Sequence, residues 1–416
     1  MKNKIFINNI LSLSTIQLMN YFFPIITFPY LVRILGVEKY GLINFAAAFV
    51  GYFSLIIDYG FNISAVRDIA IIKDGKREYD RMISAVFGVK LSLLFISFIL
   101  FEIVINNFKI FSSELPLYNI SFLVAISSAI SPQFFFQGMQ KTNELAVVTF
   151  FVKMIWAISI FRLVQNSNDY LIAALLNGSH LLLISLITFI IMLSKFKVSV
   201  NIPSKGNYIE QLRKGGMIFL STCSISIYTL SNTFLLGILS SNTAVGYFVG
   251  ADKIRQAFQN IITPLTMAGF PRASELFSNS INTGKKFIKD SLLTFGSLSF
   301  FVSLILYFFA PSIVNLILGE GFQKSIIVLK TISFLPFIIY LSNLFGIQTM
   351  LNLSMKKVFT IIIIIAAIIS LILTLVFVPI YEELGAALSM LFTEVFVTTA
   401  IILYLNKKGF FSEKTL

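Results

Sequence analysis

Apolar residues dominate the chain in long runs, and polar residues gather between those runs. About 20 apolar residues cross the hydrocarbon core of a bilayer as a helix. Backbone groups in lipid must be hydrogen-bonded within the protein, as they are in helices and closed β-barrels. Barrel strands alternate apolar and polar residues, and IIIIIAAIISLILTLVFV (361–378) lacks this alternation. The pattern therefore predicts an all-α integral membrane protein with 12 transmembrane helices. They are expected at residues 9–34, 41–63, 83–105, 116–137, 145–164, 170–194, 215–239, 244–268, 291–318, 325–351, 357–379 and 384–405.

Lysine and arginine are distributed unequally about these segments. Of the 32 basic residues, 22 fall on the side of the N-terminus and only Lys39, Lys109 and Lys324 fall in loops on the other side. Because basic residues accumulate on the cytoplasmic side, we expect both termini in the cytoplasm. Topology then accounts for most of the net charge of +13, and we expect no nucleic acid as a partner.

The composition narrows the chemistry further. The chain is 57% hydrophobic and 12% charged, with one cysteine, Cys223, and one histidine, His180. These counts exclude an internal disulfide, a cysteine cluster and a multi-histidine metal site, so we expect no metal and no cofactor. Loops of at most about 20 residues leave no room for a soluble catalytic domain. We therefore expect a transporter rather than an enzyme.

A weak internal repeat appears when the chain is shifted by 205 residues. Gly41 then meets Gly246, Ala46 meets Ala251, and Arg67 meets Arg272. Six helices per half place both halves in the same orientation, related by a pseudo-two-fold axis along the membrane normal. We expect an N-terminal lobe at 1–196, a cytoplasmic connecting loop at 197–214, and a C-terminal lobe at 215–416 with a short basic tail. Two such lobes would enclose a central cavity and work by alternating access.

Seven basic residues fall inside the predicted spans, where charge costs several kcal/mol and usually faces protein or water. Lys153, Lys253 and Arg255 lie deepest, whereas Arg33 lies near an outer end, from which its side chain can also reach the interface. The other three are Lys90, Arg162 and Lys330.

Acidic residues inside the spans are fewer, at Asp58, Asp252 and Glu394. They either pair with the bases or bind a coupling ion, H⁺ or Na⁺. Asp252 and Arg255 are three residues apart, which places them on one helix face. Because the deep bases outnumber the acids, the predicted cavity is basic and favours an anionic passenger.

Polar residues also recur at helical spacing. Gln256 and Gln259 follow Asp252 on one helix, and Tyr228 and Asn232 lie on the preceding one. Such stripes either join helices by hydrogen bonds or line a wet passage suited to a sugar.

The stretch LGVEKYG (35–41) is predicted as a tight outer turn, with Gly36 and Gly41 allowing the reversal and Glu38 and Lys39 solvated. It belongs to RILGVEKYGLINFAAAFVGYFSLIIDYGFNISAVRDIA (33–70), which resembles the opening of Wzx-type O-antigen and polysaccharide repeat-unit flippases. These form the polysaccharide transporter family of the multidrug/oligosaccharidyl-lipid/polysaccharide (MOP) exporter superfamily. SPQFFFQGMQK (131–141), GYFVGADKIRQAFQNIITPL (246–265) and FPRASEL (270–276) continue the resemblance.

The resemblance implies a MATE-like fold of two six-helix lobes in the bacterial inner membrane. The passenger would be an oligosaccharide on undecaprenyl pyrophosphate, moved from the cytoplasmic to the periplasmic leaflet for O-antigen, capsule or exopolysaccharide synthesis. Its pyrophosphate would bind Arg33, Lys153, Lys253 and Arg255, and Asp58, Asp252 or Glu394 would bind a coupling ion. Membrane lipids and other polysaccharide-assembly proteins would be further partners.

Other functions remain open at this point. A MATE-like multidrug or metabolite cation antiporter would favour an acidic cavity, and relatives that flip lipid II typically have two more helices. A membrane polysaccharide polymerase usually carries a large periplasmic loop, and a glycosyltransferase needs a nucleotide-sugar site. A structural scaffold would leave the deep charges unexplained.

Overall fold

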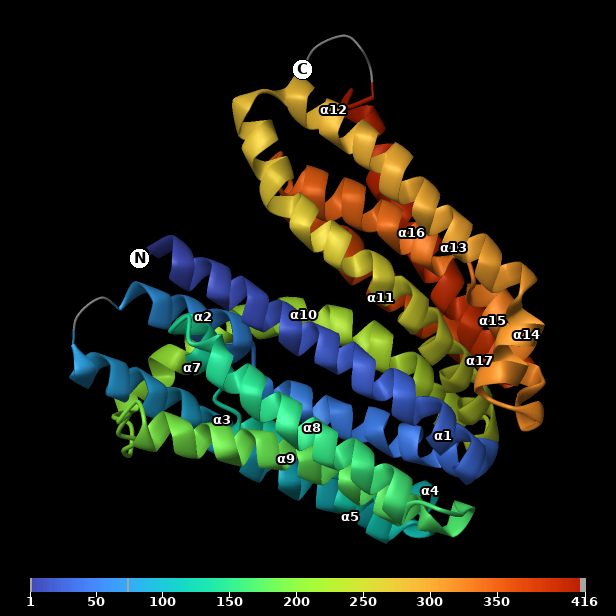
Figure 1. The fold of residues 1–416 in the computed structure, drawn as a ribbon, viewed down its shortest axis with the longest axis horizontal. Helices are drawn as coiled ribbons and strands as arrows, with labels where there is room; N and C mark the ends of the chain where they lie inside the picture. The colour runs from blue at the N-terminus through green and yellow to red at the C-terminus, as the bar shows by residue number, and fades with distance from the viewer. Residues whose placement is uncertain (1, 73–74, 412–416) are drawn as a thin grey trace. The chain divides into compact units, whose positions relative to one another are not determined.

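A computed structural model describes residues 2–72 and 75–411, without the side chains of 2–14 and of several positions within 217–228 and 263–268. Over this described part every regular element is a helix and no strand occurs (Figure 1). The all-α prediction is confirmed. The chain divides into two compact units, Met1–Ser226 and Ile227–Leu416, and the division falls within helix α10 (Lys205–Leu239).

Unit 1 contains nine helices before α10 in the described residues. They are α1 (Lys2–Asp58), α2 (Phe61–Ile71), α3 (Lys76–Asn107), α4 (Lys109–Ser112), α5 (Leu115–Ser121), α6 (Leu123–Ile130), α7 (Gln133–Gly138), α8 (Thr142–Leu163) and α9 (Tyr170–Ser194), with a 3₁₀ turn, η1 (Ser167–Asp169), before α9.

Unit 2 continues from the second part of α10. Its elements are α11 (Asn242–Asn279), α12 (Ile281–Ser291), the π-helical η2 (Leu292–Gly296), α13 (Ser297–Phe308), α14 (Ala310–Ile317), the 3₁₀ turn η3 (Glu320–Phe322), α15 (Lys324–Ile332), α16 (Leu335–Ser342), the π-helical η4 (Asn343–Met350) and α17 (Lys356–Lys407).

The longest helices, α1 and α17, each contain a break in helical geometry. A straight helix of 57 residues would be about 85 Å long, nearly three times the hydrocarbon thickness. In α1 the backbone leaves the helical region at Gly36 (φ 71°, ψ 174°), within the predicted outer turn, and Figure 1 shows α1 reversing its direction. In α17 the break is at Glu382 (φ 50°, ψ −123°), between the predicted segments 357–379 and 384–405.

Eight stretches of the described chain are long and apolar enough to cross a membrane. Two of them, Thr15–Ile71 and Lys356–Lys407, contain the breaks at Gly36 and Glu382, and a shorter apolar helix covers Thr229–Leu239. The chain is therefore a multi-pass membrane protein, and the count of 12 crossings stays a prediction.

Helices extend further at the predicted inner ends than hydropathy indicates. The expected loop 64–82 is mostly helical as the end of α2 and the start of α3, and 269–290 is occupied by α11 and α12. The sequence DYGF separates α1 from α2, because Tyr59 and Gly60 both have positive φ (45° and 77°). Gly60 also lies so close to the Gly215 carbonyl and the Ile218 side chain that a Cβ there would approach both to 3.0 Å.

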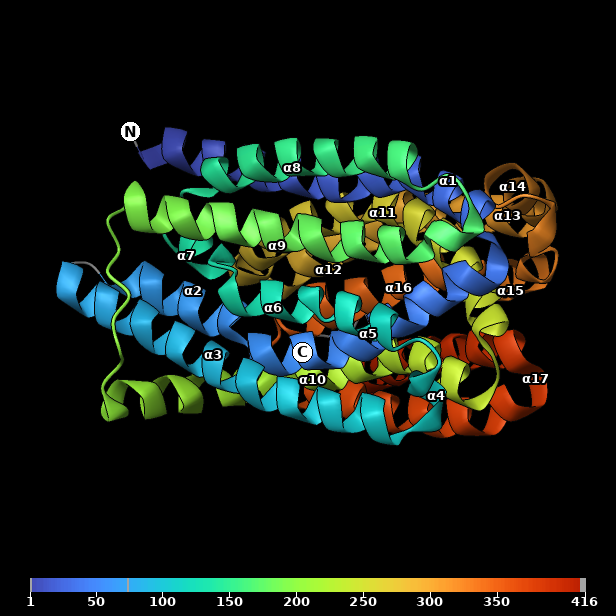
Figure 2. The ribbon, with the colours of Figure 1, turned by 90° about the horizontal axis from the view of Figure 1, so that it is seen from below.

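Within unit 1, α1 packs against α8 and α3, α2 against α7, and α8 lies beside α9 (Figure 2). A buried cluster around Phe61, Ile83 and Phe134–Phe136 fills the space among α2, α3 and α7. In unit 2, α11 packs against α12 and α15, and α16 packs against α17. Ala46 and Ala251, which the repeat pairs, are both fully buried.

Candidate functional site

Lys153 on α8 is one of the buried cations expected from the sequence. Its side chain is 9% exposed, and its Nζ donates to Oδ1 of Asn20 on α1 at 2.6 Å. The contact follows from the packing of α8 against α1. Asn20 satisfies one donor of the ammonium group without neutralising it, so this site keeps its positive charge.

A second buried cation, Lys90 on α3, contacts the chain at two places where a helix ends. Its Nζ lies 3.6 Å from Oδ1 of Asp58 at the end of α1, and it donates to the Ser131 carbonyl at 3.3 Å. Ser131 and Pro132 separate α6 from α7, and the ring of Phe134 lies 5.6 Å from the ammonium. The Lys90 side chain is 1% exposed, whereas that of Asp58 is 35% exposed. The predicted ion-coupling residue Asp58 is therefore an ion-pair partner in this structure.

Unit 2 carries a polar cluster along one face of α11. The Arg255 Nε donates to Oδ1 of Asp252 at 2.7 Å, and its Nη1 donates to Oε1 of Gln259. Gln256 Nε2 donates to the other Asp252 oxygen at 2.7 Å. The three- and four-residue spacing of these side chains produces the contacts, as expected for one helix face. Asp252 thus balances the charge of Arg255.

Lys253 lies next to this cluster in sequence but differs from it. A one-residue step turns a helix by about 100°, so the side chain leaves the face of Asp252 and Arg255. It is exposed, and among the described residues no carboxylate lies within ion-pair distance of it.

The remaining predicted residues are placed separately. Arg33 is exposed on α1, near Gly36, and Glu394 on α17 is buried. Asn232 on α10 is buried and accepts from the Thr374 hydroxyl of α17 at 2.7 Å, so it joins two helices of unit 2. Tyr228 was predicted to join helices or line a passage, and its side chain lies outside those that the structure describes.

The sequence did not indicate a charged cluster in unit 1 that involves the LGVEKYG turn. Lys39 lies 3.3 Å from Oε1 of Glu114, which also accepts from the Tyr170 hydroxyl at 2.6 Å. The Lys39 ammonium sits 4.2 Å from the centre of the Tyr170 ring. The expectation that Lys39 is a solvated loop charge is wrong, because an acid and an aromatic ring from distant segments are brought against it.

Each unit thus holds a cation that no described carboxylate balances, Lys153 in unit 1 and Lys253 in unit 2. Each also holds an acid–base pair, Asp58 with Lys90 and Asp252 with Arg255. Among the residues described, no group of three His, Cys, Asp or Glu side chains is placed to hold a metal ion. These features suit binding of an anion by ammonium groups.

The chain is similar to a known protein family and to a curated relative. Residues 6–277 match the family described as polysaccharide biosynthesis protein. A curated relative from Escherichia coli (strain K12), named "Putative O-antigen transporter", is 33% identical over 402 residues, which is 96% of each chain.

Solved structures show the same fold at low identity. The lipid II flippase MurJ, in an inward closed conformation, has a TM-score of 0.71 at 16% identity, over 97% of this chain and 89% of MurJ. An inward-facing multidrug resistance MATE family transporter of the MOP superfamily has a TM-score of 0.67 at 14% identity. That similarity covers 98% of this chain and 100% of the transporter.

Proposed function

The chain belongs to the polysaccharide biosynthesis protein family, and from this premise we propose that it is a flippase for lipid-linked oligosaccharides. It moves oligosaccharide units on undecaprenyl pyrophosphate from the cytoplasmic to the periplasmic leaflet of a bacterial inner membrane, by alternating access. The observation that carries the proposal is the near full-length similarity to the E. coli relative whose name describes an O-antigen transporter. The resemblance found in the sequence motifs agrees with it.

The chemistry of the passenger fits the basic residues of the predicted membrane segments. A pyrophosphate diester carries two negative charges, which lose their hydration when the headgroup leaves water. Ammonium groups without a carboxylate partner can replace that hydration, and each unit offers one, Lys153 or Lys253. Arg33 adds an exposed guanidinium on α1. Arg255 acts only when Asp252 releases it, so its contribution depends on the state of that pair.

The acidic residues provide a means of coupling to an ion gradient. A proton on Asp58 or a sodium ion beside it would weaken its attraction to Lys90, and the same holds for Asp252 and Arg255. Lys90 would then be held by the Ser131 carbonyl alone, at the break between α6 and α7. Glu394, buried in α17, is the third candidate for this role.

The function is tested by deleting the gene in its own cell and analysing the lipid fraction and the surface polysaccharide. We expect lipid-linked oligosaccharides to accumulate and surface polysaccharide to fall, with both restored by the wild-type gene. Continued surface polysaccharide without accumulation contradicts the proposal. Resistance to cationic drugs conferred by expression, with polysaccharide unchanged, would identify a multidrug antiporter instead.

The charge requirement is tested with Lys253→Ala in the complemented strain. We expect surface polysaccharide to fall at least tenfold at unchanged protein level, because one charge-assisted contact contributes about 1.5–3 kcal/mol. The matched control is Lys289→Ala, an exposed lysine of α12 in the same unit. Surface polysaccharide at the wild-type level in the Lys253 variant would show that this residue does not bind the pyrophosphate.

A further inference from the structure

A cavity of about 530 Å³ opens in unit 1 between the start of α3 and the segment that leads into α10. Its volume lies within the roughly 300–1,000 Å³ typical of small-molecule sites. Of the lining residues that the structure describes, all but Ile202 and Pro203 are polar or charged. The cavity lies on the side of the chain where basic residues predict the cytoplasm.

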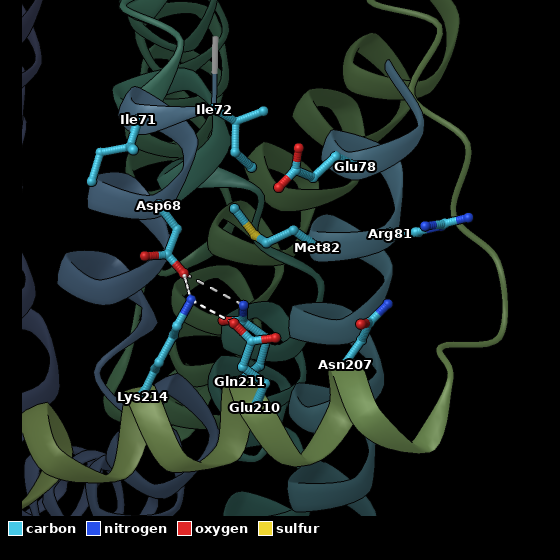
Figure 3. A pocket seen from close by; sticks show the side chains of 10 residues that line it. All are labelled: Asp68, Ile71, Ile72, Glu78, Arg81, Met82, Asn207, Glu210, Gln211 and Lys214. Carbon is cyan, nitrogen blue, oxygen red and sulfur yellow. Dashed lines mark hydrogen bonds and ion pairs between the residues drawn. The ribbon is translucent and has the colours of Figure 1, made fainter. Parts of the chain in front are cut away.

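Two arginines, Arg77 and Arg81, line this cavity from α3. They are four residues apart, so they lie one helical turn from each other on one face. Both are exposed, so a ligand can reach them. Figure 3 shows the Arg81 side chain extending from α3 away from Asp68 and Lys214, toward the loop that leads into α10. The ion pairs found among the described residues of unit 1 are all made by lysines and involve neither arginine.

Asp80, the one carboxylate among the described lining residues, is already engaged by the backbone. Its Oδ1 accepts from the N–H of Ser199 at 3.2 Å. The Ser84 hydroxyl oxygen accepts from the N–H of Asn201 at 3.0 Å. These two bonds hold the segment before α10 against α3 and give the cavity fixed walls. Two guanidinium groups against one engaged carboxylate leave the cavity with an excess of positive charge.

The charge and the donors of the lining favour a phosphate group as the ligand. A guanidinium is planar, and its fork of N–H groups fits two oxygens of one phosphate. The amides of Asn201 and Asn207 line the same cavity and can supply neutral donors. A cationic ligand would be repelled by the arginines, and no group of three His, Cys, Asp or Glu side chains in the described residues can hold a metal ion.

The wall formed by residues 199–204 reaches the edge of the predicted membrane segment 83–105. A Cβ on Gly88 would lie 2.7 Å from Cγ of Pro203, so this wall packs on α3 inside the predicted boundary. Ile202 in the same wall is 98% exposed. An isoleucine in that position gains free energy when it contacts hydrocarbon instead of water. Basic and apolar residues that line one cavity at this level suit a lipid, with its phosphate on the arginines and its hydrocarbon on Ile202.

We propose that this cavity binds the phosphate of an anionic phospholipid from the cytoplasmic leaflet, with Arg77 and Arg81 donating to the phosphate oxygens. Ile202 then contacts the glycerol and the first methylene groups of the lipid. An anionic headgroup fits better than a zwitterionic one, whose ammonium group would meet the charge of the arginines. The inference goes beyond the proposed function, because this lipid stays in its leaflet and is not the passenger. A lipid held there ties the segment between α9 and α10 to the membrane surface.

The test measures binding of phosphatidylglycerol to the purified full-length protein by native mass spectrometry, with phosphatidylcholine as the comparison lipid. The double variant Arg77→Gln/Arg81→Gln removes both charges, and Ile202→Asn removes the apolar contact at similar volume. The matched control is Arg67→Gln/Arg213→Gln, at two exposed arginines of α2 and α10 in the same unit that do not line the cavity. A separate titration adds inorganic phosphate in large excess over the lipid.

We expect the wild type and the control variant to bind phosphatidylglycerol equally, and both to bind it more tightly than phosphatidylcholine. The Arg77 and Arg81 double variant should bind phosphatidylglycerol about tenfold more weakly, because each basic residue near a lipid headgroup adds to the attraction. Ile202→Asn should weaken binding several-fold, and inorganic phosphate should not displace the lipid. If the arginine variant does not fold, Ile202→Asn and the phosphate titration decide the question.

The proposal is overturned if the arginine double variant loses no more affinity than the control does, or if the wild type binds the two lipids equally. Displacement of phosphatidylglycerol by inorganic phosphate would identify a soluble phosphate as the ligand and overturn the assignment to a lipid. Wild-type affinity in Ile202→Asn would overturn the apolar contact. Because binding is measured without transport, none of these results depends on the flippase function.

Discussion

The ion pair between Asp58 and the buried Lys90 allows a quantitative test of how unit 1 is held together. The perturbations are Asp58→Asn, Lys90→Met and the double variant. At 3.6 Å and an effective dielectric constant of about 20, the attraction between the two charges is about 4–5 kcal/mol. Asp58 is 35% exposed, so water screens the pair, and the Ser131 carbonyl still holds Lys90 when the carboxylate is lost. We therefore expect a coupling energy of about 2 kcal/mol.

The single variants should differ in their cost. Asp58→Asn leaves a buried ammonium without its counter-charge and should lower the free energy of unfolding by about 2–3 kcal/mol. Lys90→Met leaves a carboxylate that water can still reach, so its cost should be smaller. The double variant should be more stable than the sum of the two changes predicts, because neither charge then remains unpaired.

Unfolding can be followed in mixed micelles through fluorescence of Trp156, the single tryptophan of the chain, which lies in unit 1 on α8. Lys195 and Glu144 serve as the control pair, since they lie 3.0 Å apart in the same unit but Lys195 is 62% exposed. Their double-mutant cycle should give less than about 1 kcal/mol. Additive effects at Asp58 and Lys90, within about 0.5 kcal/mol, would refute the view that this pair stabilises unit 1.

Two further predictions concern Gly385, which follows the break in α17 at Glu382, and the buried cation Lys153. Gly385→Ala should destabilise unit 2 by about 3 kcal/mol, because a Cβ there would lie 2.3 Å from the Phe377 carbonyl oxygen. Loss of helical circular dichroism follows both variants, since Trp156 lies in unit 1 and Gly385 in unit 2. The control Gly206→Ala, whose Cβ would meet nothing within 4 Å, should be neutral or slightly stabilising in this measurement. Asn20→Leu should cost about 1 kcal/mol by removing the acceptor of Lys153, and adding Lys153→Met should restore stability. Surface polysaccharide should nevertheless stay at least tenfold reduced in that double variant, and normal polysaccharide would exclude Lys153 from substrate binding.

Hydropathy predicted the helices inside the membrane well but not their extensions. The predicted segments 145–164 and 170–194 correspond closely to α8 (Thr142–Leu163) and α9 (Tyr170–Ser194). At the predicted inner ends, charged residues such as Lys76 and Arg77 begin a helix ahead of the predicted membrane segment 83–105. Hydropathy alone treats such residues as a loop, because it registers transfer to lipid rather than backbone geometry.

The contacts of the candidate site were also predictable only in part. The pair of Asp252 and Arg255 could be predicted because three-residue spacing on a helix brings side chains together. The contact of Lys153 with Asn20 joins residues 133 positions apart, and only the packing of α8 on α1 creates it. The contacts of Lys39 with Glu114 and Tyr170 likewise join distant segments of unit 1, and the sequence did not indicate them.

The central claim is that this chain moves lipid-linked oligosaccharide across a membrane. Its most direct test reconstitutes the purified protein in vesicles that carry undecaprenyl-pyrophosphate-linked oligosaccharide. A glycan-cleaving enzyme is added outside, and loss of the protected inner sugar is followed with time. Wild-type protein should expose the inner sugar many times faster than protein-free vesicles do, and the Lys253→Ala protein should be markedly slower than wild type. Equal rates with and without the wild-type protein would contradict the account.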